Sequence, residues 1–305
     1  MKIKKEEFNV RSSDNIHDLA GIIYVPEGEP KGIFQIVHGM TEHIGRYDRF
    51  MTFMANNGYI VCGHDHLGHG RTAKSGEYGF FAEKKGYQRV VDDVALFGDA
   101  VREKFSKDLP YFLMGHSMGS FIARLTAAQY DRQDKLIVMG TGGPNKISGA
   151  GLCFIRLLKL FKGKRNYSTI LDKVGFGSYN EHFIGENDPK SWISSIPEER
   201  HKTNDDVCCN FKFTLSAMED LMMLNRLSNK KKWANSLNKN KPVLLVSGTE
   251  DPVGDYGEGV KKVCEMLKAA GVPVTMKLYK NARHEILNDI SMDEVNKDIL
   301  EFIEK

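Results

Sequence analysis

Short apolar runs rich in Val, Ile, Phe and Tyr recur along the chain, and each is bounded by glycine, proline or charged residues. Runs of this length and composition are typical of buried β-strands. Eight segments fit the pattern: FNVRS, AGIIYV, GIFQIVHG, YIVCGHD, YFLMG, KLIVMG, PVLLVSG and VTMKLY.

From GIFQIVHG onward, segments with helical periodicity separate these runs, at roughly residues 46–57, 87–106, 118–131, 257–270 and 291–304. Such alternation predicts βαβ crossovers and a sheet covered by helices on both faces. The first two strands are joined by the short turn SSDN, so we expect them to pair antiparallel at one edge. The chain is therefore predicted to be an α/β protein with an eight-stranded, mostly parallel sheet.

One gap breaks this alternation. About a hundred residues separate KLIVMG from PVLLVSG, far more than a simple loop in a compact domain needs. We assign residues 144–230 to an inserted, mainly helical cap, and residues 1–143 and 231–305 to the core.

Within the predicted cap, the segment GLCFIRLLKLFKGKR is expected to form an amphipathic helix near residues 152–162. Its basic side carries Arg156, Lys159 and Lys162, with Leu152 and Ile155 among them. This helix either packs on the body of the protein or touches a membrane surface transiently, with its cations near anionic headgroups. The broad apolar face consists of Cys153, Phe154, Leu157, Leu158, Leu160 and Phe161.

Charge and cysteine content narrow the class of protein. The 305 residues include 43 Lys plus Arg and 40 Asp plus Glu, a net charge of +3, which argues against a nucleic-acid partner. The five cysteines form no CxxC pair and suit free thiols in a reducing compartment. No apolar run resembles a signal peptide core or a membrane span of about 20 residues. We expect a soluble, cytoplasmic protein, and composition sets no oligomeric state.

One serine lies between two glycines where a strand gives way to a helix. In LPYFLMGHSMGSFIARLTAAQY, the run YFLM precedes the motif Gly115-x-Ser117-x-Gly119, and a helical pattern follows it. A strand, a tight turn of this composition and a helix define the nucleophile elbow, which lifts the serine hydroxyl above the sheet. Ser117 is therefore the predicted nucleophile.

A serine nucleophile needs a histidine base and a carboxylate that orients it, and on this type of sheet they follow the serine in the order carboxylate, histidine. Asp251 follows the strand PVLLVSG within a Pro-containing loop, and His284 is the only histidine downstream of it. We predict the triad Ser117, Asp251 and His284. Nearby carboxylates compete with Asp251 for its role: Glu250, Asp255 and Asp289.

The tetrahedral intermediate of acyl transfer requires backbone N–H donors aimed at its oxyanion. One donor usually follows the nucleophile, and the second lies in the loop after an early strand. The backbone amides of Met118 and of Met40, in IVHGMTEH, are the predicted donors.

Five motifs, HGMTEHIGRY, GHDHLGHGRT, GHSMGS, GTEDPVG and NARHEIL, occur in this order. Together they resemble the monoacylglycerol lipase and lysophospholipase branch of the α/β-hydrolases, which is also catalogued as serine aminopeptidase-like. The resemblance covers residues 8–143 and 235–305. It implies the α/β-hydrolase fold and the same triad and oxyanion donors.

The resemblance adds three substrate-binding residues, Glu42, Arg46 and His116, which match positions near the polar glycerol end of the substrate. Carboxylate, guanidinium and imidazole groups hydrogen-bond hydroxyls well. An alternative is that Glu42 and Arg46 form an ion-pair network that holds the oxyanion loop.

The histidine-rich segment HDHLGHGRT resembles a metal site in composition only. The family resemblance gives it a structural role beneath the nucleophile, with Asp65 and residues 68–70 shaping turns and Thr72 where the family often has Ser. We expect no metal and no cofactor.

These residues predict a serine hydrolase of carboxylic esters that works through an acyl-serine, most similar to a monoacylglycerol lipase or lysophospholipase. Its partner is a small-molecule acyl ester. Alternatives on the same triad are a small-ester carboxylesterase, a thioesterase or an aminopeptidase, and a remote one is a non-catalytic ligand-binding protein. An apolar acyl tunnel or simply the core of the cap would account for the aromatic and Met-rich residues Phe211, Phe213, Met218, Met222 and Met223.

Overall fold

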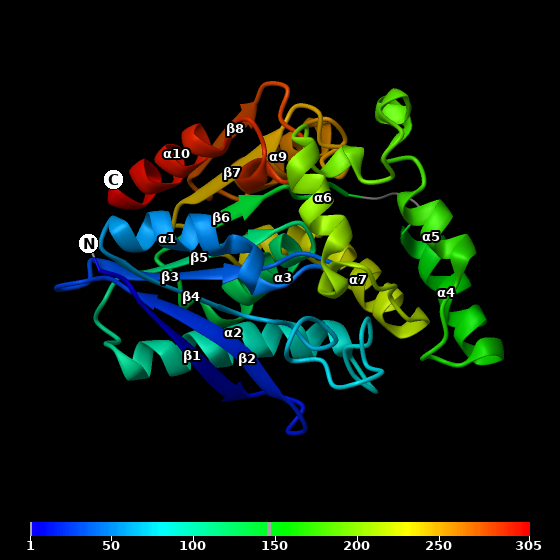
Figure 1. The fold of residues 1–305 in the computed structure, drawn as a ribbon, viewed down its shortest axis with the longest axis horizontal. Coiled ribbons are helices and arrows are strands. Elements are labelled where there is room, and N and C mark those ends of the chain that lie inside the picture. The colour runs from blue at the N-terminus through cyan, green and yellow to red at the C-terminus, as the bar shows by residue number, and fades with distance from the viewer. Residues whose placement is uncertain (1, 145–147) are drawn as a thin grey trace.

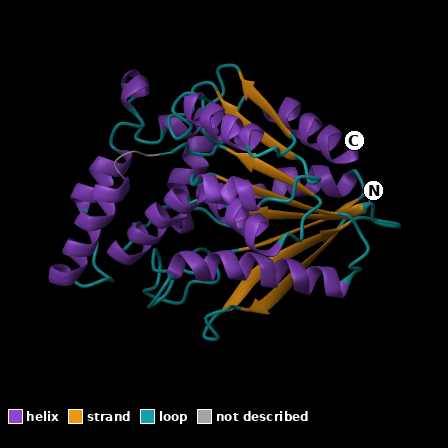
Figure 2. Ribbon diagram, turned by 180° about the vertical axis from the view of Figure 1, so that it is seen from behind, coloured by secondary structure: helices purple, strands orange, loops and turns teal. Residues whose placement is uncertain are grey.

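The computed structural model describes residues 2–144 and 148–305. Residue 1 of the predicted core and residues 145–147 of the predicted cap lie outside this part. The described chain forms one eight-stranded sheet between two layers of helices, with a further group of helices beyond one end of the sheet (Figures 1 and 2).

The sheet has the strand order β1-β2-β4-β3-β5-β6-β7-β8. β2 is antiparallel to both neighbours, and the other neighbouring pairs are parallel, which confirms the prediction. β3, β4, β5 and β7 are buried at every position, because helices cover both faces, and so their sequences are almost continuously apolar. The strands are β1 (Lys4–Arg11), β2 (Asp18–Val25), β3 (Gly32–Val37), β4 (Tyr59–His64), β5 (Tyr111–His116), β6 (Lys135–Met139), β7 (Val243–Gly248) and β8 (Val274–Tyr279).

The five helices predicted for the core are present, and each begins and ends within two residues of the expected position. α1 and α10 cover one face of the sheet with side chains such as Phe50 and Ile299. α2, α3 and α9 cover the other face with side chains such as Val94, Ile122 and Val263. Their bounds are α1 (Asp48–Asn56), α2 (Gly86–Lys104), α3 (Met118–Tyr130), α9 (Glu258–Ala269) and α10 (Met292–Glu304).

The chain between β6 and β7 is mainly helical and contains α4 to α8. Figure 1 shows α4 and α5 standing at one side of the molecule, away from the sheet. α7 contacts α2, α3 and α4, so it connects this region to the core. The helices are α4 (Ser148–Lys162), α5 (Thr169–Phe176), α6 (Pro197–Asp205), α7 (Leu215–Ser228) and α8 (Lys231–Ser236), and short 3₁₀ turns cover Glu181–Glu186, Ser191–Ile193 and Val207–Cys209.

α4 packs on α7 through the side that the sequence marked as basic. Leu152 and Ile155 are buried. Arg156 and Lys159 turn this side toward α7 because both bond the carboxylate of Glu219, at 2.7 and 2.5 Å. No helix within the described chain combines the length and hydropathy that a membrane span requires. The predicted apolar face is exposed instead, at Phe154 (42%), Leu157 (50%), Leu160 (82%) and Phe161 (82%).

Candidate active site

Ser117 occupies the joint between β5 and α3 in a strained conformation. Its backbone has φ 53° and ψ −121°, which residues with a side chain rarely adopt. The Ser117 amide donates to the carbonyl of Met139 on the neighbouring strand at 3.0 Å, which helps to hold the turn. The strand-turn-helix expected from the sequence is therefore present.

The two glycines flanking Ser117 allow the start of α3 to lie directly against the sheet. A Cβ on Gly119 would lie 2.1 Å from the carbonyl oxygen of Val37 at the end of β3. A Cβ on Gly115 would lie 2.2 Å from the carbonyl oxygen of Gly119. No side chain fits either position, which explains why the serine sits between glycines.

His284 and Asp251 form a buried pair. His284 Nδ1 lies 2.9 Å from Asp251 Oδ1, and the two residues are 3% and 0% exposed. Asp251 also accepts hydrogen bonds from Ser247 Oγ at 2.8 Å and from the Val253 amide at 2.9 Å. Burial disfavours the ionised carboxyl, but the charge of His284 and these hydrogen bonds outweigh it and hold the pKa of Asp251 below its ordinary value.

The three carboxylates that competed with Asp251 either accept other hydrogen bonds or face solvent. Asp289 accepts from the backbone amides of Arg283, at 2.6 Å, and Ser195, at 3.0 Å. Asp255 is exposed, and Glu250 is partly so. Asp251 is the carboxylate that the fold brings to His284.

Ser117, His284 and Met40 line one cavity of about 1070 Å³. The loop after β3 lies beside the serine, because a Cβ on Gly39 would lie 3.1 Å from the Cβ of Ser117. Met118, the first residue of α3, buries its side chain in the core. The two predicted oxyanion donors therefore belong to segments that flank Ser117.

Glu42 is a buried carboxylate that organises this loop. Its Oε1 accepts a hydrogen bond from the amide of Gly39, from Tyr47 Oη at 2.9 Å and from His116 Nδ1 at 3.1 Å. Burial alone would raise the pKa of Glu42, but His116 and Arg46 lower it to about 2. The alternative in which Glu42 holds the oxyanion loop therefore has direct geometric support.

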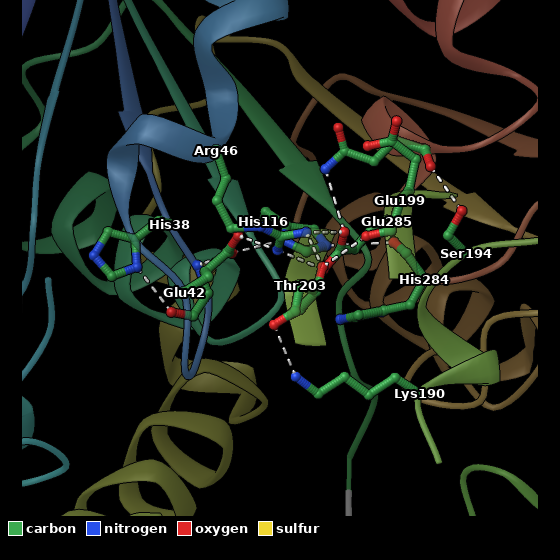
Figure 3. A network of polar contacts seen from close by, with 12 residues as sticks. His38, Glu42, Arg46, His116, Lys190, Ser194, Glu199, Thr203, His284 and Glu285 are labelled. Atoms are coloured by element: carbon green, nitrogen blue, oxygen red, sulfur yellow. Dashed lines mark hydrogen bonds and ion pairs between the residues drawn. The ribbon is translucent and has the colours of Figure 1, made fainter. Parts of the chain in front are cut away.

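Arg46 joins Glu42 to the histidine loop (Figure 3). Its guanidinium contacts both carboxylate oxygens of Glu285 at 2.7 Å, Glu42 at 3.2 Å and Thr203 Oγ1 at 2.7 Å. Sequence reasoning missed Glu285, although it directly follows His284 in the quoted motif NARHEIL.

His116 connects Glu42 to the histidine loop from the other side. Its Nε2 lies 3.3 Å from the carbonyl oxygen of His284, and the two imidazole rings are 4.7 Å apart. Burial alone would lower the pKa of His116, but the hydrogen bond and the charge of Glu42 outweigh it, so the pKa is raised. His116 thus contacts Glu42 and the His284 backbone, and it also lines the cavity.

Residues of the inserted region hold the histidine loop directly. The His284 amide donates to the carbonyl of Trp192 at 3.3 Å, and the Glu285 amide donates to the carbonyl of Ile193 at 2.7 Å. Next to them, Arg283 donates to the carbonyl of Ser191 at 2.6 Å. The position of the His284 imidazole therefore depends on the segment that includes residues 191–193.

The histidine-rich segment is a buried framework. Asp65 accepts from the amides of Ile44 and Arg71, both at 2.8 Å. The Thr72 hydroxyl donates to the Asp65 carbonyl at 2.6 Å and accepts from the Ala20 amide at 2.8 Å. The side chains of His64, His66 and His69 are buried.

Another group of side chains, outside the histidine-rich segment, places possible metal-ligand atoms close together. Side-chain atoms of His43, Asp206 and Cys209 lie within 4.8 Å of one another. His43 Nε2 is already hydrogen-bonded to Asp206 Oδ2 at 2.7 Å, which links the loop after β3 to the helical segment between β6 and β7. All five cysteines are free thiols.

Aromatic and Met side chains supply the apolar part of the cavity, beside Phe121, Leu171 and Phe176. Phe213 and Met218 are nearly inaccessible, so they belong to the packed core as well as to the cavity wall. The packed-core alternative therefore holds for Phe213 and Met218, and the acyl tunnel stays a prediction. The expected residues that line the cavity are Phe211, Phe213, Met218 and Met222.

A mostly parallel sheet, a strained serine turn after β5 and a histidine–carboxylate pair after later strands define an α/β-hydrolase. Within this class, the chain belongs to the serine aminopeptidase S33 family, whose model matches residues 28–291.

Solved structures and relatives agree with this assignment. The crystal structure of a thermostable carboxyl esterase from Bacillus coagulans, in complex with glycerol, is 33% identical, with a TM-score of 0.92 over 98% of both chains. A lipase in an open form is 26% identical, with a TM-score of 0.90 over 99% of this chain and 98% of its own. Monoglyceride lipase from Homo sapiens is 26% identical over 267 residues, which cover 87% of this chain and 79% of that protein.

Proposed function

We propose that the protein hydrolyses carboxylic esters through an acyl-Ser117 intermediate, and that it acts on monoacylglycerols and related esters with a single acyl chain. One observation carries this proposal. The strained serine, the His284–Asp251 pair, a polar network and an apolar wall all meet in the cavity of about 1070 Å³. A single-chain ester presents the matching combination of a polar head, a reactive carbonyl and an apolar tail.

The proposed mechanism gives each step to a group in the cavity. Asp251 holds His284 through Nδ1, which leaves Nε2 to remove the Ser117 proton as Oγ attacks the ester carbonyl. The amides of Met40 and Met118 donate to the resulting oxyanion. Protonated His284 then gives its proton to the leaving alcohol, and a water molecule activated by the same imidazole releases the acid and frees Ser117.

The polar and apolar parts of the cavity suit the two ends of this substrate. Glu42, Arg46 and His116 line its polar end, where glycerol hydroxyls would bind, and Glu42 also orders the oxyanion loop. Each buried methylene of the acyl chain contributes about 0.8 kcal/mol, so an apolar wall of this size favours longer chains. The carboxyl esterase crystallised with glycerol and the human monoglyceride lipase support this choice.

Residues 144–230 would act as the cap over this cavity and contact membrane surfaces transiently. The residues Leu160 and Phe161 on α4 and Ile170 and Val174 on α5 expose apolar side chains, which is the surface that lipid headgroup regions accept. Arg156 and Lys159 are engaged by Glu219, so we assign the contact to apolar side chains. The free thiols suit the cytoplasm.

A second candidate is a carboxylesterase for small esters, which the 33% identity to a carboxyl esterase favours. Acyl-chain length separates the two candidates. If the protein prefers small esters, the apolar wall of the cavity has room for only a short acyl chain.

A fluorophosphonate probe and a substrate panel test the proposal. The panel is monoacylglycerols from short to long chain, lysophosphatidylcholine, p-nitrophenyl acetate and an aminoacyl amide. We expect labelling and ester hydrolysis by the wild type and by Ser236→Ala, which alters an exposed serine of α8, and neither activity in Ser117→Ala. An unlabelled wild type, or a labelled Ser117→Ala, would refute the nucleophile. Turnover of acetate alone would refute the lipase assignment.

A further inference from the structure

Lys190 places an ammonium group in the wall of the cavity that Ser117 also lines. The side chain is half-buried, and Nζ donates to the carbonyl of Thr203 at 3.2 Å and to Asn210 Oδ1 at 2.8 Å. Both acceptors are neutral, and no carboxylate of the described residues lies within 4.0 Å of Nζ. An ammonium has three donors, so one N–H remains for a ligand.

Lys190 lies beside the polar network through Thr203 (Figure 3). The carbonyl of Thr203 accepts from Lys190, and its hydroxyl accepts from Arg46 Nη2 at 2.7 Å. The two cations therefore flank one residue. Lys190 is consequently at the end of the cavity where the alcohol part of the substrate would bind.

The two carboxylates of this network have partners other than Lys190. The carboxylates of Glu42 and Glu285 are matched by the Arg46 guanidinium, which contacts both, and by His116, which bonds Glu42. Glu42 raises the pKa of His116 against the effect of burial. Lys190 adds a further positive charge, on which Glu285 and Asp188 act only at longer range than a direct ion pair.

A partly buried cation of this kind is suited to an anionic ligand. Burial lowers the pKa of Lys190, and an anion at Nζ would stabilise the charged form. Phosphate oxygens form strong charge-assisted hydrogen bonds with ammonium groups, and lysine is a common point-charge contact for phosphate.

We propose that Lys190 selects acyl esters whose alcohol carries a phosphate group, such as acylglycerol phosphates, over neutral monoacylglycerols. The inference rests on the proposed function, because the ester carbonyl of such a substrate has to reach Ser117. The phosphate binds Lys190 Nζ, and the acyl chain occupies the apolar wall.

The test compares kcat/KM for 1-octanoylglycerol and 1-octanoylglycerol 3-phosphate, both presented as monomers so that aggregate surface charge has no influence. We expect the wild type to prefer the phosphate ester. In Lys190→Gln the ratio of the two kcat/KM values should fall roughly tenfold to a hundredfold, and Lys190→Arg should restore part of it. Lys202→Gln is the control, because Lys202 is an exposed residue of α6 that pairs with Glu199 at 2.8 Å.

Three results would overturn the inference. An equal loss on both substrates in Lys190→Gln, with a lower Tm, would make Lys190 a brace within the inserted region. A wild type that is labelled by fluorophosphonate and hydrolyses the neutral ester without preferring the phosphate would refute this inference and leave the proposed function intact. Inhibition of 1-octanoylglycerol hydrolysis by inorganic phosphate as strong as that by glycerol 3-phosphate would mean that the site takes free phosphate. If the wild type shows neither fluorophosphonate labelling nor hydrolysis of any ester, the proposed function itself is refuted.

Discussion

A single methyl group at Gly119 would push the two halves of the proposed oxyanion site apart. In Gly119→Ala the new Cβ would lie 2.1 Å from the carbonyl oxygen of Val37 and 2.4 Å from that of His38. Both obstacles are backbone atoms, which no side-chain rotation can move. Val37 and His38 lead directly into Gly39 and Met40, so the clash falls on the loop that carries one of the two proposed donors.

The size of the displacement follows from these distances. A carbon atom and a carbonyl oxygen need about 3.3 Å, so the start of α3 and the end of β3 would have to separate by about 1.2 Å. Overpacking of this kind typically costs about 1–3 kcal/mol of unfolding free energy. A misplacement of about 1 Å between catalytic groups reduces the rate by about a hundredfold. We expect both effects together.

The assay measures kcat/KM on p-nitrophenyl butyrate and the free energy of unfolding in urea. Gly185→Ala is the matched control, because a Cβ there meets no atom within 4 Å, and its unfolding free energy should change by less than about 0.5 kcal/mol. If Gly119→Ala keeps its wild-type kcat/KM and stability, the close approach of α3 to β3 is not what aligns the site.

Other changes probe the site and its framework. Asp251→Asn should lower kcat by about 10⁴-fold, because the imidazole loses the charge that orients it, and a fall of less than about tenfold would contradict the pairing. Glu42→Gln should lower kcat roughly tenfold to a hundredfold by weakening the hydrogen bonds to His116 and Arg46, and unchanged kinetics would show that the loop holds its shape without the charge. Burial lowers the pKa of His64 from 6.5 to about 3, so the unfolded chain takes up this proton first as the pH falls. Below about pH 6.5 the wild type should therefore lose about 1.4 kcal/mol of unfolding free energy per pH unit relative to His64→Leu, and a pH-independent difference in urea unfolding would refute this.

The sheet could be predicted from the sequence because burial on both faces demands an apolar residue at nearly every position. The fully buried β7, Val243–Gly248, begins one residue inside the predicted run PVLLVSG and ends where that run ends. β1 begins at Lys4, four residues before the predicted run, because an edge strand tolerates charged side chains that the pattern excludes. The error at β1 therefore falls on charged, partly exposed positions, which an apolar pattern does not include.

The same distinction applies to the site. Local motifs and their order along the chain are sufficient to predict Ser117, Asp251 and His284. The role of Glu285 depends on Arg46, which is 239 residues away, so no local pattern indicates the contact. The packing side of α4 depends on Glu219 of α7, about 60 residues further along, and amphipathicity alone left that side open. Contacts between distant elements are what the sequence alone leaves open.

The hydrogen bonds from His284 and Glu285 to Trp192 and Ile193 limit how this protein can diverge or be engineered. α4 and α5, which stand at one side of the molecule, are candidates for exchange with the corresponding helices of a relative to alter chain-length preference. The segment around residues 191–193 is different, since replacing it would alter the main-chain partners of the histidine. A chimera that keeps residues 191–193 together with the β-sheet core of the same protein should retain turnover. A chimera that takes all of residues 144–230 from a relative would first have to re-form the hydrogen bonds between the foreign segment and the histidine loop.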